Sequence, residues 1–230
     1  MFDHFYVTGV GSLGYLFIYA PLSFFIVRWF YRKIAGRVVD SRRAGIISIT
    51  LMVLILGAPI WDINQIGQET KRLCEEKAGL RVYKTVEADG FIGGRSIDIY
   101  AKHGYLFTER AGSGDKKYRY TLDEGRVVEE EIHNFSVSHG YLGLGTDEVI
   151  GDHHSVHTVA VGDINTQEVY AEFVRVLTYP GWIDNIFIGV TGTGSGFSPW
   201  LCGDESPDSG EKKLTISDLI YQTIKPSNKQ

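Results

Sequence analysis

The stretch from Gly45 to Trp61 contains no charged residue, and this run limits what the chain can fold into. A helix needs roughly 17–25 mainly apolar residues to cross about 30 Å of hydrocarbon, and this run meets the lower end of that range. A second apolar segment precedes it at residues 7–27. Its glycines and Pro21 are unfavourable in a soluble helix, but in lipid small residues permit close helix contact and neighbours can satisfy a freed carbonyl. We therefore predict a two-helix transmembrane hairpin over residues 1–61, with spans at about 7–28 and 44–61.

The loop between the two predicted spans, residues 29–43, is basic. It holds a single acid, Asp40, and five basic residues: Arg32, Lys33, Arg37, Arg42 and Arg43. Short basic loops stay in the cytoplasm, so both termini are expected outside it. The expected location is a bacterial inner membrane with a periplasmic domain.

Two alternatives to the hairpin are less consistent with the sequence. A cleaved signal peptide needs positive charge before the apolar stretch and small residues after it, whereas here the charges follow the first stretch. A soluble protein with a buried helical hairpin is the other alternative. Two long uncharged runs that flank a basic loop do not favour it.

The remainder of the chain is long enough for one domain with its own core, and it is acidic. Only Asp3 and Asp40, of 28 acidic residues, precede residue 44. Nucleic acids and anionic lipid surfaces are recognised by clustered cations. This composition therefore argues against nucleic acid as a partner, and it leaves the two helices as the contact with the lipid bilayer.

Both cysteines of the chain, Cys74 and Cys202, fall in the part that is predicted to lie outside the cytoplasm. Two cysteines in an oxidising compartment indicate a disulfide. The alternative is a pair of unconnected small core residues, which is common for isolated cysteines.

Beyond the second span the spacing of apolar residues predicts first a helix and then strands. Residues 62–79 are predicted as a juxtamembrane helix that continues the second span, bends near Pro59 and stops at Gly79. Alternation of apolar and polar residues then predicts strands. They are expected at residues 80–87, 96–100, 105–109, 117–122, 126–133, 155–161, 167–178 and 186–190.

Short strands separated by turns, without amphipathic helices between them, predict an antiparallel sheet. Residues 203–213 are almost free of apolar side chains and are expected to form a mobile loop, and residues 215–224 are expected to form a closing helix. The predicted fold class is an α+β membrane protein. It has the N-terminal transmembrane hairpin, then a mainly antiparallel β extracytoplasmic domain over residues 80–230 that ends with the C-terminal helix.

The densest group of metal-binding residue types is a short stretch that contains Asp152, His153, His154 and His157. Neutral imidazole is a good ligand for zinc or copper. On a strand, however, His153 and His157 share one face and His154 points to the other, so His133 and His139 would have to complete a site. Loop-edge histidines without a metal are the alternative, and no cofactor is expected in that case.

Aromatic residues near a predicted turn are candidates for a protein contact. Tyr179 and Trp182 flank a Pro-Gly pair, and Trp200 follows a glycine-rich stretch. Tyrosine and tryptophan combine apolar area with a polar tip, which suits them to contact surfaces.

These features favour a non-catalytic envelope protein over an enzyme. We expect the extracytoplasmic domain to bind another protein, as an accessory or assembly subunit or as an inhibitor or immunity-like factor. The alternative is a membrane-tethered, metal-dependent hydrolase that uses His133, His139, His153, His154 and His157.

Overall fold

The computed structural model describes residues 9–35, 41–94, 96–142, 145–191, 200–203 and 215–227. Its contacts divide the chain into two units. The helical unit comprises Met1–Glu75, Ile150–His154 and Leu177–Leu201, and the β-rich unit comprises Glu76–Val149, Ser155–Val176 and Cys202–Gln230.

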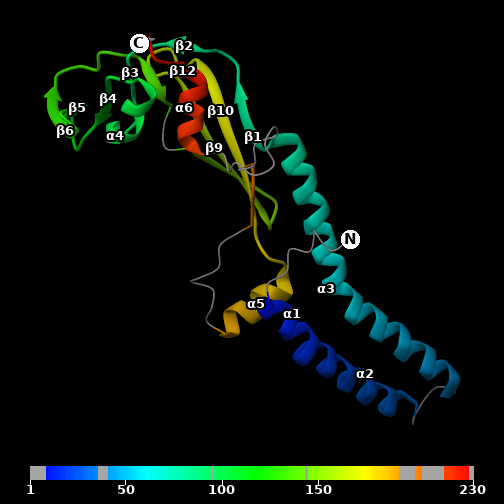
Figure 1. Ribbon diagram of the computed structural model, residues 1–230. Helices are drawn as coiled ribbons and strands as arrows, with labels where there is room; N and C mark the ends of the chain where they lie inside the picture. Colours follow the sequence, from blue (N-terminus) through cyan, green and yellow to red (C-terminus); the bar gives the residue numbers. More distant parts are fainter. Residues whose placement is uncertain are drawn as a thin grey trace. The chain divides into compact units, whose positions relative to one another are not determined.

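The helical unit begins with one helical segment in three parts: α1 (Gly9–Gly14), a π-helical turn η1 (Tyr15–Tyr19) and α2 (Ala20–Ala35) (Figure 1). Pro21 explains the π-helical turn. It lacks an N–H, and in a regular α-helix its ring would clash with the carbonyl of Phe17. The Ala20 N–H bonds instead to the Tyr15 carbonyl. This five-residue spacing is that of a π-bulge.

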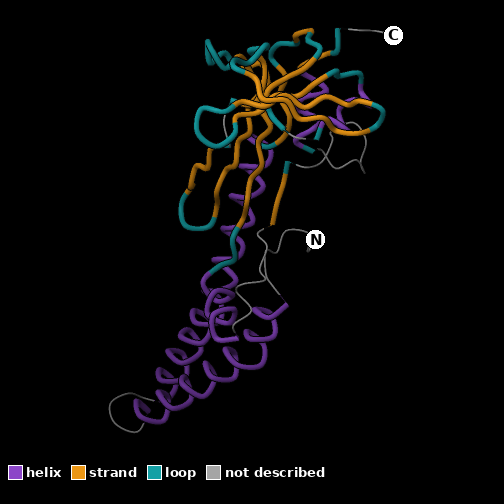
Figure 2. The backbone as a smooth tube through the Cα atoms, turned by 90° about the vertical axis from the view of Figure 1, so that its left-hand side faces the viewer, coloured by secondary structure: helices purple, strands orange, loops and turns teal. Residues whose placement is uncertain are grey.

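The second apolar run lies in one long helix, α3 (Ser41–Lys77), with Pro59 inside it. The predicted second span and juxtamembrane helix are therefore continuous. Residues 29–35 and 41–43 of the predicted loop are helical, which leaves a connection at residues 36–40 that falls outside the described residues. The segments on either side of this connection run antiparallel (Figure 2).

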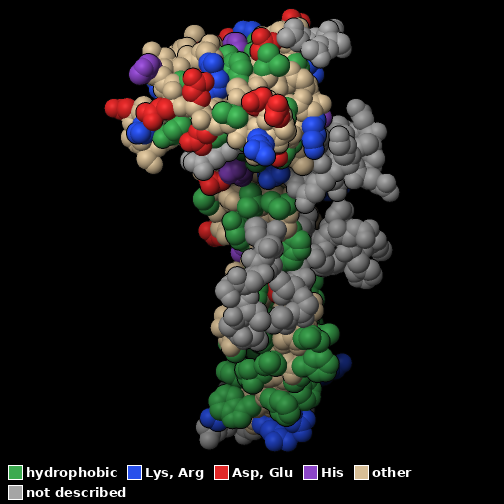
Figure 3. All heavy atoms as spheres, turned by 60° about the vertical axis from the view of Figure 1, so that its left-hand side comes forward, with side chains coloured by type: hydrophobic (Ala, Val, Ile, Leu, Met, Phe, Trp, Pro, Cys, Tyr) green, Lys and Arg blue, Asp and Glu red, His purple; other side chains and the backbone are tan. Residues whose placement is uncertain are grey.

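On the face drawn in Figure 3, apolar side chains cover much of these helices, and basic side chains gather at one end of them. Lys33 and Arg32 lie in the last turn of α2, and Arg42 and Arg43 open α3. Large apolar residues are exposed along both helical segments: Leu13, Leu16, Phe17, Ile18, Leu22, Phe24, Phe25, Ile26, Trp29 and Phe30 on the first, and Ile46, Ile47, Ile49, Val53, Leu54, Ile60 and Trp61 on the second.

A further helix of this unit, α5 (Trp182–Thr191), occupies the region where residues 186–190 were predicted to form a strand. That prediction was wrong. The β-branched residues of this run suggested a strand, but Ile183 and Phe187 are one helical turn apart, and packing against α1 overrides the local preference.

The β-rich unit is built on a mixed but mainly antiparallel sheet. Its strand order is β1-β10-β9-β7-β3-β4-β5-β6, with β11 paired to β10 and β8 to β9. The pairings of β3 with β4 and with β7 are parallel, as is that of the separate pair β2 and β12. The strands are β1 (Gly79–Val82), β2 (Val86–Glu87), β3 (Gly90–Ile92), β4 (Phe107–Ala111), β5 (Lys117–Asp123), β6 (Arg126–Ile132), β7 (His139–Tyr141), β8 (Thr146–Ile150), β9 (His154–Asp163), β10 (Val169–Thr178), β11 (Trp200–Cys202) and β12 (Ile224–Lys225).

The core of this unit lies between the sheet and α6 (Ile216–Thr223), the predicted closing helix. The Thr215 N–H and Oγ1 both donate to Asp218 Oδ2, at 2.8 and 2.7 Å, and this fixes the first turn of α6. Leu219, Ile220 and Ile224 are completely buried against Phe91. Several tyrosines of this unit are also buried: Tyr100, Tyr105, Tyr120 and Tyr170.

Two predicted strands of this unit differ from the structure. Residues 96–100 form a short helix, α4 (Ile97–Tyr100), followed by a 3₁₀ turn, η2 (Ala101–His103), because Ile97 and Tyr100 are both buried on one helical face. The predicted strand at residues 80–87 is divided into β1 and β2. It is interrupted where the N–H groups of Tyr83 and Lys84 both donate to the Tyr170 carbonyl, at 2.8 and 3.0 Å. The predicted loop at 203–213 lies outside the described residues except for Gly203.

A fully buried carboxylate, Glu109 on β4, ties the sheet to the loop after β6. Its Oε1 accepts two hydrogen bonds from Arg119, from Nη2 at 2.8 Å and from Nε at 3.0 Å. Ser136 donates two more to the same carboxylate, from its hydroxyl at 2.7 Å and from its backbone N–H at 2.9 Å. Four donors compensate for the removal of the charge from water. This arrangement has the character of a structural ion pair.

Candidate functional site

The two apolar helical segments are joined by two tyrosines of the π-helical turn. Tyr19 Oη donates to the Ile55 carbonyl at 2.8 Å, and Tyr15 Oη donates to the Leu56 carbonyl at 2.9 Å. The two rings stack with centroids 5.7 Å apart. Because Pro59 has no N–H, it cannot bond to the carbonyl four residues earlier, which belongs to Ile55. Tyr19 therefore replaces the donor that Pro59 lacks.

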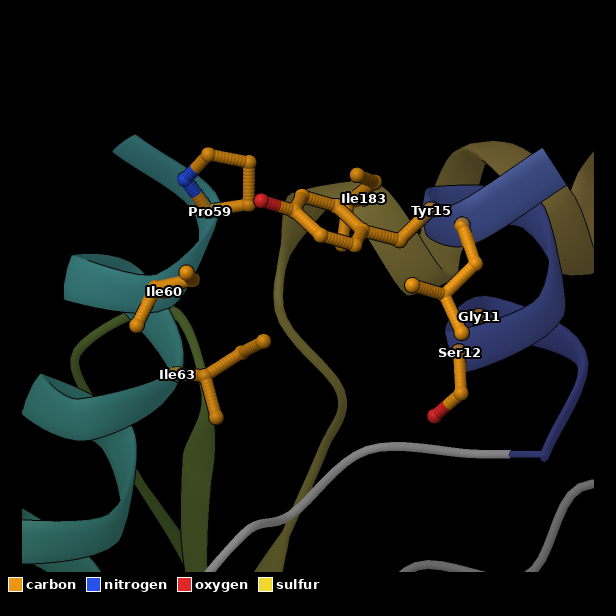
Figure 4. Close-up of a pocket in the computed structure, with 8 residues that line it drawn as sticks. Gly11, Ser12, Tyr15, Pro59, Ile60, Ile63 and Ile183 are labelled. Atoms are coloured by element: carbon orange, nitrogen blue, oxygen red, sulfur yellow. The ribbon is translucent and has the colours of Figure 1, made fainter. Parts of the chain in front are cut away.

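A small apolar pocket of ≈ 250 Å³ lies beside this contact (Figure 4). It lies between the first helical segment, α3 and α5, and its lining is almost entirely apolar. The residues that line it are Gly11, Ser12, Tyr15, Leu16, Pro59, Ile60, Ile63 and Ile183. In Figure 4, Tyr15 extends toward Pro59, so that the π-turn tyrosine and the proline border the same space. The pocket suits an apolar chain better than a polar substrate.

Helix α5 packs against α1 at two glycines. A Cβ atom on Gly11 would overlap the Asp184 carboxylate, and one on Gly14 would overlap the Phe187 ring. The absence of these side chains allows the close approach. The N-terminal glycines were predicted to permit close helix contact, but nothing in the sequence indicated α5 as the partner helix.

The start of α5 is fixed to α3. Asp62 Oδ2 accepts the backbone N–H of Trp182 at 3.2 Å, and a Cβ atom on Gly181 would lie 2.5 Å from the same oxygen. His153 Nδ1–H donates to the Pro180 carbonyl at 3.2 Å. Since Asp62 is the first residue after the apolar run of α3, the first turn of α5 lies beside the end of that run.

A buried polar cluster lies further along α3, where it meets the first residue of β9 and the last residue of β10. Thr70, His154 and Thr178 are 2%, 6% and 0% exposed. The Thr70 hydroxyl donates to the Ile66 carbonyl at 2.7 Å, so the same oxygen accepts from His154 Nε2 at 2.9 Å and from Thr178 Oγ1 at 3.1 Å. The arrangement requires His154 to carry its proton on Nε2.

Burial lowers the pKa of His154 below its ordinary value, because the charged imidazolium loses its hydration there. The Ile66 carbonyl and the charge of Glu69 oppose this shift but do not cancel it. His154 is therefore held as a neutral, structural histidine.

The other predicted metal ligands are not brought together with His154. His157 Nδ1 lies 2.7 Å from Asp147 Oδ1, His139 Nδ1 lies 3.3 Å from the Tyr170 hydroxyl, and His133 is exposed after β6. Within the described ranges, which include Asp152, His153, His154 and His157, no group of three or more potential ligands is placed to hold a metal ion. The structure therefore does not bring the predicted zinc or copper ligands together: His139, His153, His154 and His157 each contact a different part of the chain.

The predicted contact residues have mixed surroundings. Tyr179 is 39% exposed, and its backbone N–H donates to the His153 carbonyl at 2.8 Å. Trp182 is 37% exposed and packs edge-on against Tyr19, with centroids 5.9 Å apart. Trp200 is half-buried on β11. Part of the surface of Tyr179 and Trp182 is therefore used inside the helical unit.

Cys74 and Cys202 are disulfide-bonded, in agreement with the predicted pairing. A cross-link between residues so distant in sequence restricts the unfolded chain strongly. Its presence is consistent with an oxidising compartment.

Comparison of the chain with protein-family models, curated proteins and solved structures gives no match.

The bond from Tyr19 to Ile55 is predicted to depend on Pro59. We expect Tyr19→Phe to lower the free energy of unfolding by about 1 kcal/mol, the order found for polar contacts between membrane helices. In a Pro59→Ala background the cost should nearly vanish, because the introduced alanine supplies the regular helical N–H to Ile55. Titration of the full chain with dodecyl sulfate in mixed micelles measures both values.

Tyr15→Phe is the matched control, since its acceptor, the Leu56 carbonyl, has the N–H of Ile60 as its regular helical donor. Its effect should be small in both backgrounds. An equal cost of Tyr19→Phe with and without Pro59 would contradict the proposed compensation.

The lowered pKa of His154 predicts loss of stability in mild acid. The folded state prefers the neutral imidazole, so its contribution to stability is complete above the ordinary histidine pKa, near 6.5. It is lost progressively as the pH falls below that value toward the lower pKa of the folded state. We expect the Tm of the solubilised chain to fall between pH 7.5 and 5.5, and His154→Gln, which keeps a donor toward Thr70, to reduce that fall.

The exposed His133 provides the control, and His133→Gln should leave the pH dependence of Tm unchanged. If the His154→Gln chain loses as much stability in acid as the parent chain, the assignment to His154 is wrong.

Proposed function

We propose that the chain is a non-catalytic, membrane-anchored envelope protein whose β-rich unit lies outside the cytoplasm and binds another protein. Two helical segments, Gly11–Lys33 and Arg42–Lys77, are long and apolar enough to cross a membrane. In the most apolar 18-residue stretch of each segment, only 17% and 11% is buried, respectively. This exposure favours spans over the core helices of a soluble protein, because an extended apolar surface in water is unfavourable.

The proposed orientation follows from the distribution of charge. Arg32, Lys33, Arg42 and Arg43 lie at the end of the helices beside the connection, and positively charged ends stay in the cytoplasm. The proposal therefore places the connection inside and the β-rich unit outside, which in a bacterial inner membrane means the periplasm. The disulfide supports this side of the membrane.

The surface proposed for the partner is the edge strand β6, and its exposure is the observation that carries the binding proposal. β6 is the last strand in the order of the sheet, and every residue of it except Ile132 is exposed. Among the described residues it pairs only with β5. A long exposed edge is a template for a further strand.

The register of β5 and β6 shows which backbone groups are free for such a strand. The two strands are joined by Glu124 and Gly125, both with positive φ, as in the tight turns of two-residue hairpins. The flanking pair Asp123 and Arg126 is then hydrogen-bonded, and bonding alternates along the ladder. By this alternation the N–H and C=O groups of Val127, Glu129 and Glu131 point away from β5.

The partner proposed for this edge is an extended, basic segment of another protein. Glu129 and Glu131 lie on one face of β6 and Glu130 on the other, and the charge of Glu131 is partly offset by Lys116 at 3.0 Å. An added strand would gain main-chain hydrogen bonds from the edge, and Lys or Arg side chains on it would meet the glutamates. Charge also protects an edge against indiscriminate pairing, so the same residues provide selectivity.

The proposed orientation predicts the behaviour of C-terminal fusions. Alkaline phosphatase joined after Gln230 should be active in a bacterial host, because its disulfides form only outside the cytoplasm, and a green fluorescent protein at the same position should stay dark. Enzyme assay and fluorescence of intact cells measure the two outcomes. A fluorescent chain with inactive phosphatase would reverse the topology.

The edge-strand proposal predicts a specific effect of proline at Glu129. A photoreactive residue in place of Val127 should cross-link an extended segment of the partner in native membranes, and Glu129→Pro should abolish the adduct, because it removes an outward N–H. Glu129→Ala keeps that N–H and should weaken the adduct only a few-fold. Mass spectrometry of the adduct identifies the cross-linked segment.

Thermal unfolding provides the control, because Glu129→Pro leaves the bonds between β5 and β6 intact. Glu130→Pro removes an N–H of that ladder and should lower Tm. An adduct of undiminished yield in the Glu129→Pro chain would contradict strand addition at this edge.

A further inference from the structure

Helix α5 presents an apolar outer face. Ile186 and Val190, one helical turn apart, are 52% and 79% exposed, whereas Ile183 and Asp184 are 2% and 0% exposed. Asp184 is the only charged residue in the sequence of α5, and its side chain is on the buried side. The exposed residues of this helix are therefore uncharged, and Ile186 and Val190 are its large aliphatic ones. Asn185 is also exposed, but its side-chain amide donates to the Pro180 carbonyl at 3.2 Å.

Two contacts place this face next to the apolar surface of the candidate spans. α5 packs on α1 through Gly11 and Gly14, and the neighbouring turn of the first segment exposes Leu16 and Phe17, at 60% and 73%. Its first residue, Trp182, is bonded to Asp62, directly after Trp61, which is 68% exposed. Figure 1 shows α5 beside α1 in this unit.

The length of α5 limits how it can meet a bilayer. Its ten residues extend about 15 Å at 1.5 Å per residue, roughly half of the hydrocarbon thickness. It therefore cannot cross, but a short helix with one apolar face can lie at the boundary between headgroups and acyl chains. The tryptophan at its start suits that boundary.

We propose that α5 is a third membrane-embedded element, with Ile186 and Val190 in contact with lipid acyl chains at the outer boundary of the bilayer. This inference rests on the proposed membrane anchor, because its lipid contact continues the surface of α1 and η1. The apolar pocket that Ile183 helps to line adjoins the same contact. The occupant of the exposed face is lipid, since the face adjoins the exposed surface of a candidate span and has no charge for a polar partner.

Quenching of a fluorophore by labelled lipid tests the proposal on the full chain. Single cysteines in place of Ile186 or Val190 are labelled with an environment-sensitive fluorophore, while the native cysteines remain disulfide-bonded and unreactive. The proteins are reconstituted in phosphatidylcholine vesicles with or without brominated acyl chains. We expect bromine to quench both labels by at least half of the fraction seen for a label at Phe17.

Two matched positions separate the possible outcomes. Phe17, in the first candidate span, is the lipid-facing reference at 73% exposure, and Val149 on β8 is the aqueous reference at 76% exposure. If Phe17 is quenched while Ile186 and Val190 behave like Val149, the inference about α5 is overturned and the anchor stands. If Phe17 itself is not quenched, the proposed anchor fails, and the lipid contact of α5 fails with it.

Discussion

The arrangement of the helical unit depends on how two prolines are accommodated inside helices. Pro21 is accommodated by the π-helical turn before it, which redirects the Ala20 N–H to Tyr15. Pro59 is accommodated from outside its own helix, by the hydroxyl of Tyr19 on the Ile55 carbonyl. Since the π-turn spans Tyr15 to Tyr19, the irregularity of one helix supplies the donors for the other. In an apolar environment such compensation has few alternatives.

Glycines and buried polar groups attach further elements to the two helical segments. Gly11 and Gly14 let α5 approach α1, Asp62 receives the first N–H of α5, and Thr70 receives His154. The proposed membrane anchor is therefore more than two hydrophobic segments: α3 also receives the first residue of β9 and the last of β10. The histidines that suggested metal chemistry contribute here as separate hydrogen-bonding groups.

The sequence predicted those parts of the fold that repeat a simple pattern. The two apolar runs, the hairpin of β5 and β6, the long strands β9 and β10 and the capped helix α6 follow from hydrophobic period and capping residues. The sequence did not reveal α5, α4 or the division of the first strand, because tertiary contacts decide them: Gly11 beside Asp184, Ile97 in the core, and a shared Tyr170 carbonyl. The sequence also did not reveal that His153, His154 and His157, close neighbours in sequence, bond to different parts of the chain.

The position of α5 in the chain has a consequence for biogenesis. It follows β10, far beyond α3, and it is too short to halt a polypeptide in a protein-conducting channel. On the proposed topology it would be exported together with the strands of the β-rich unit and would reach the bilayer from the outside. Its insertion would then await the folding of the strands before it, so that the anchor is completed only after export.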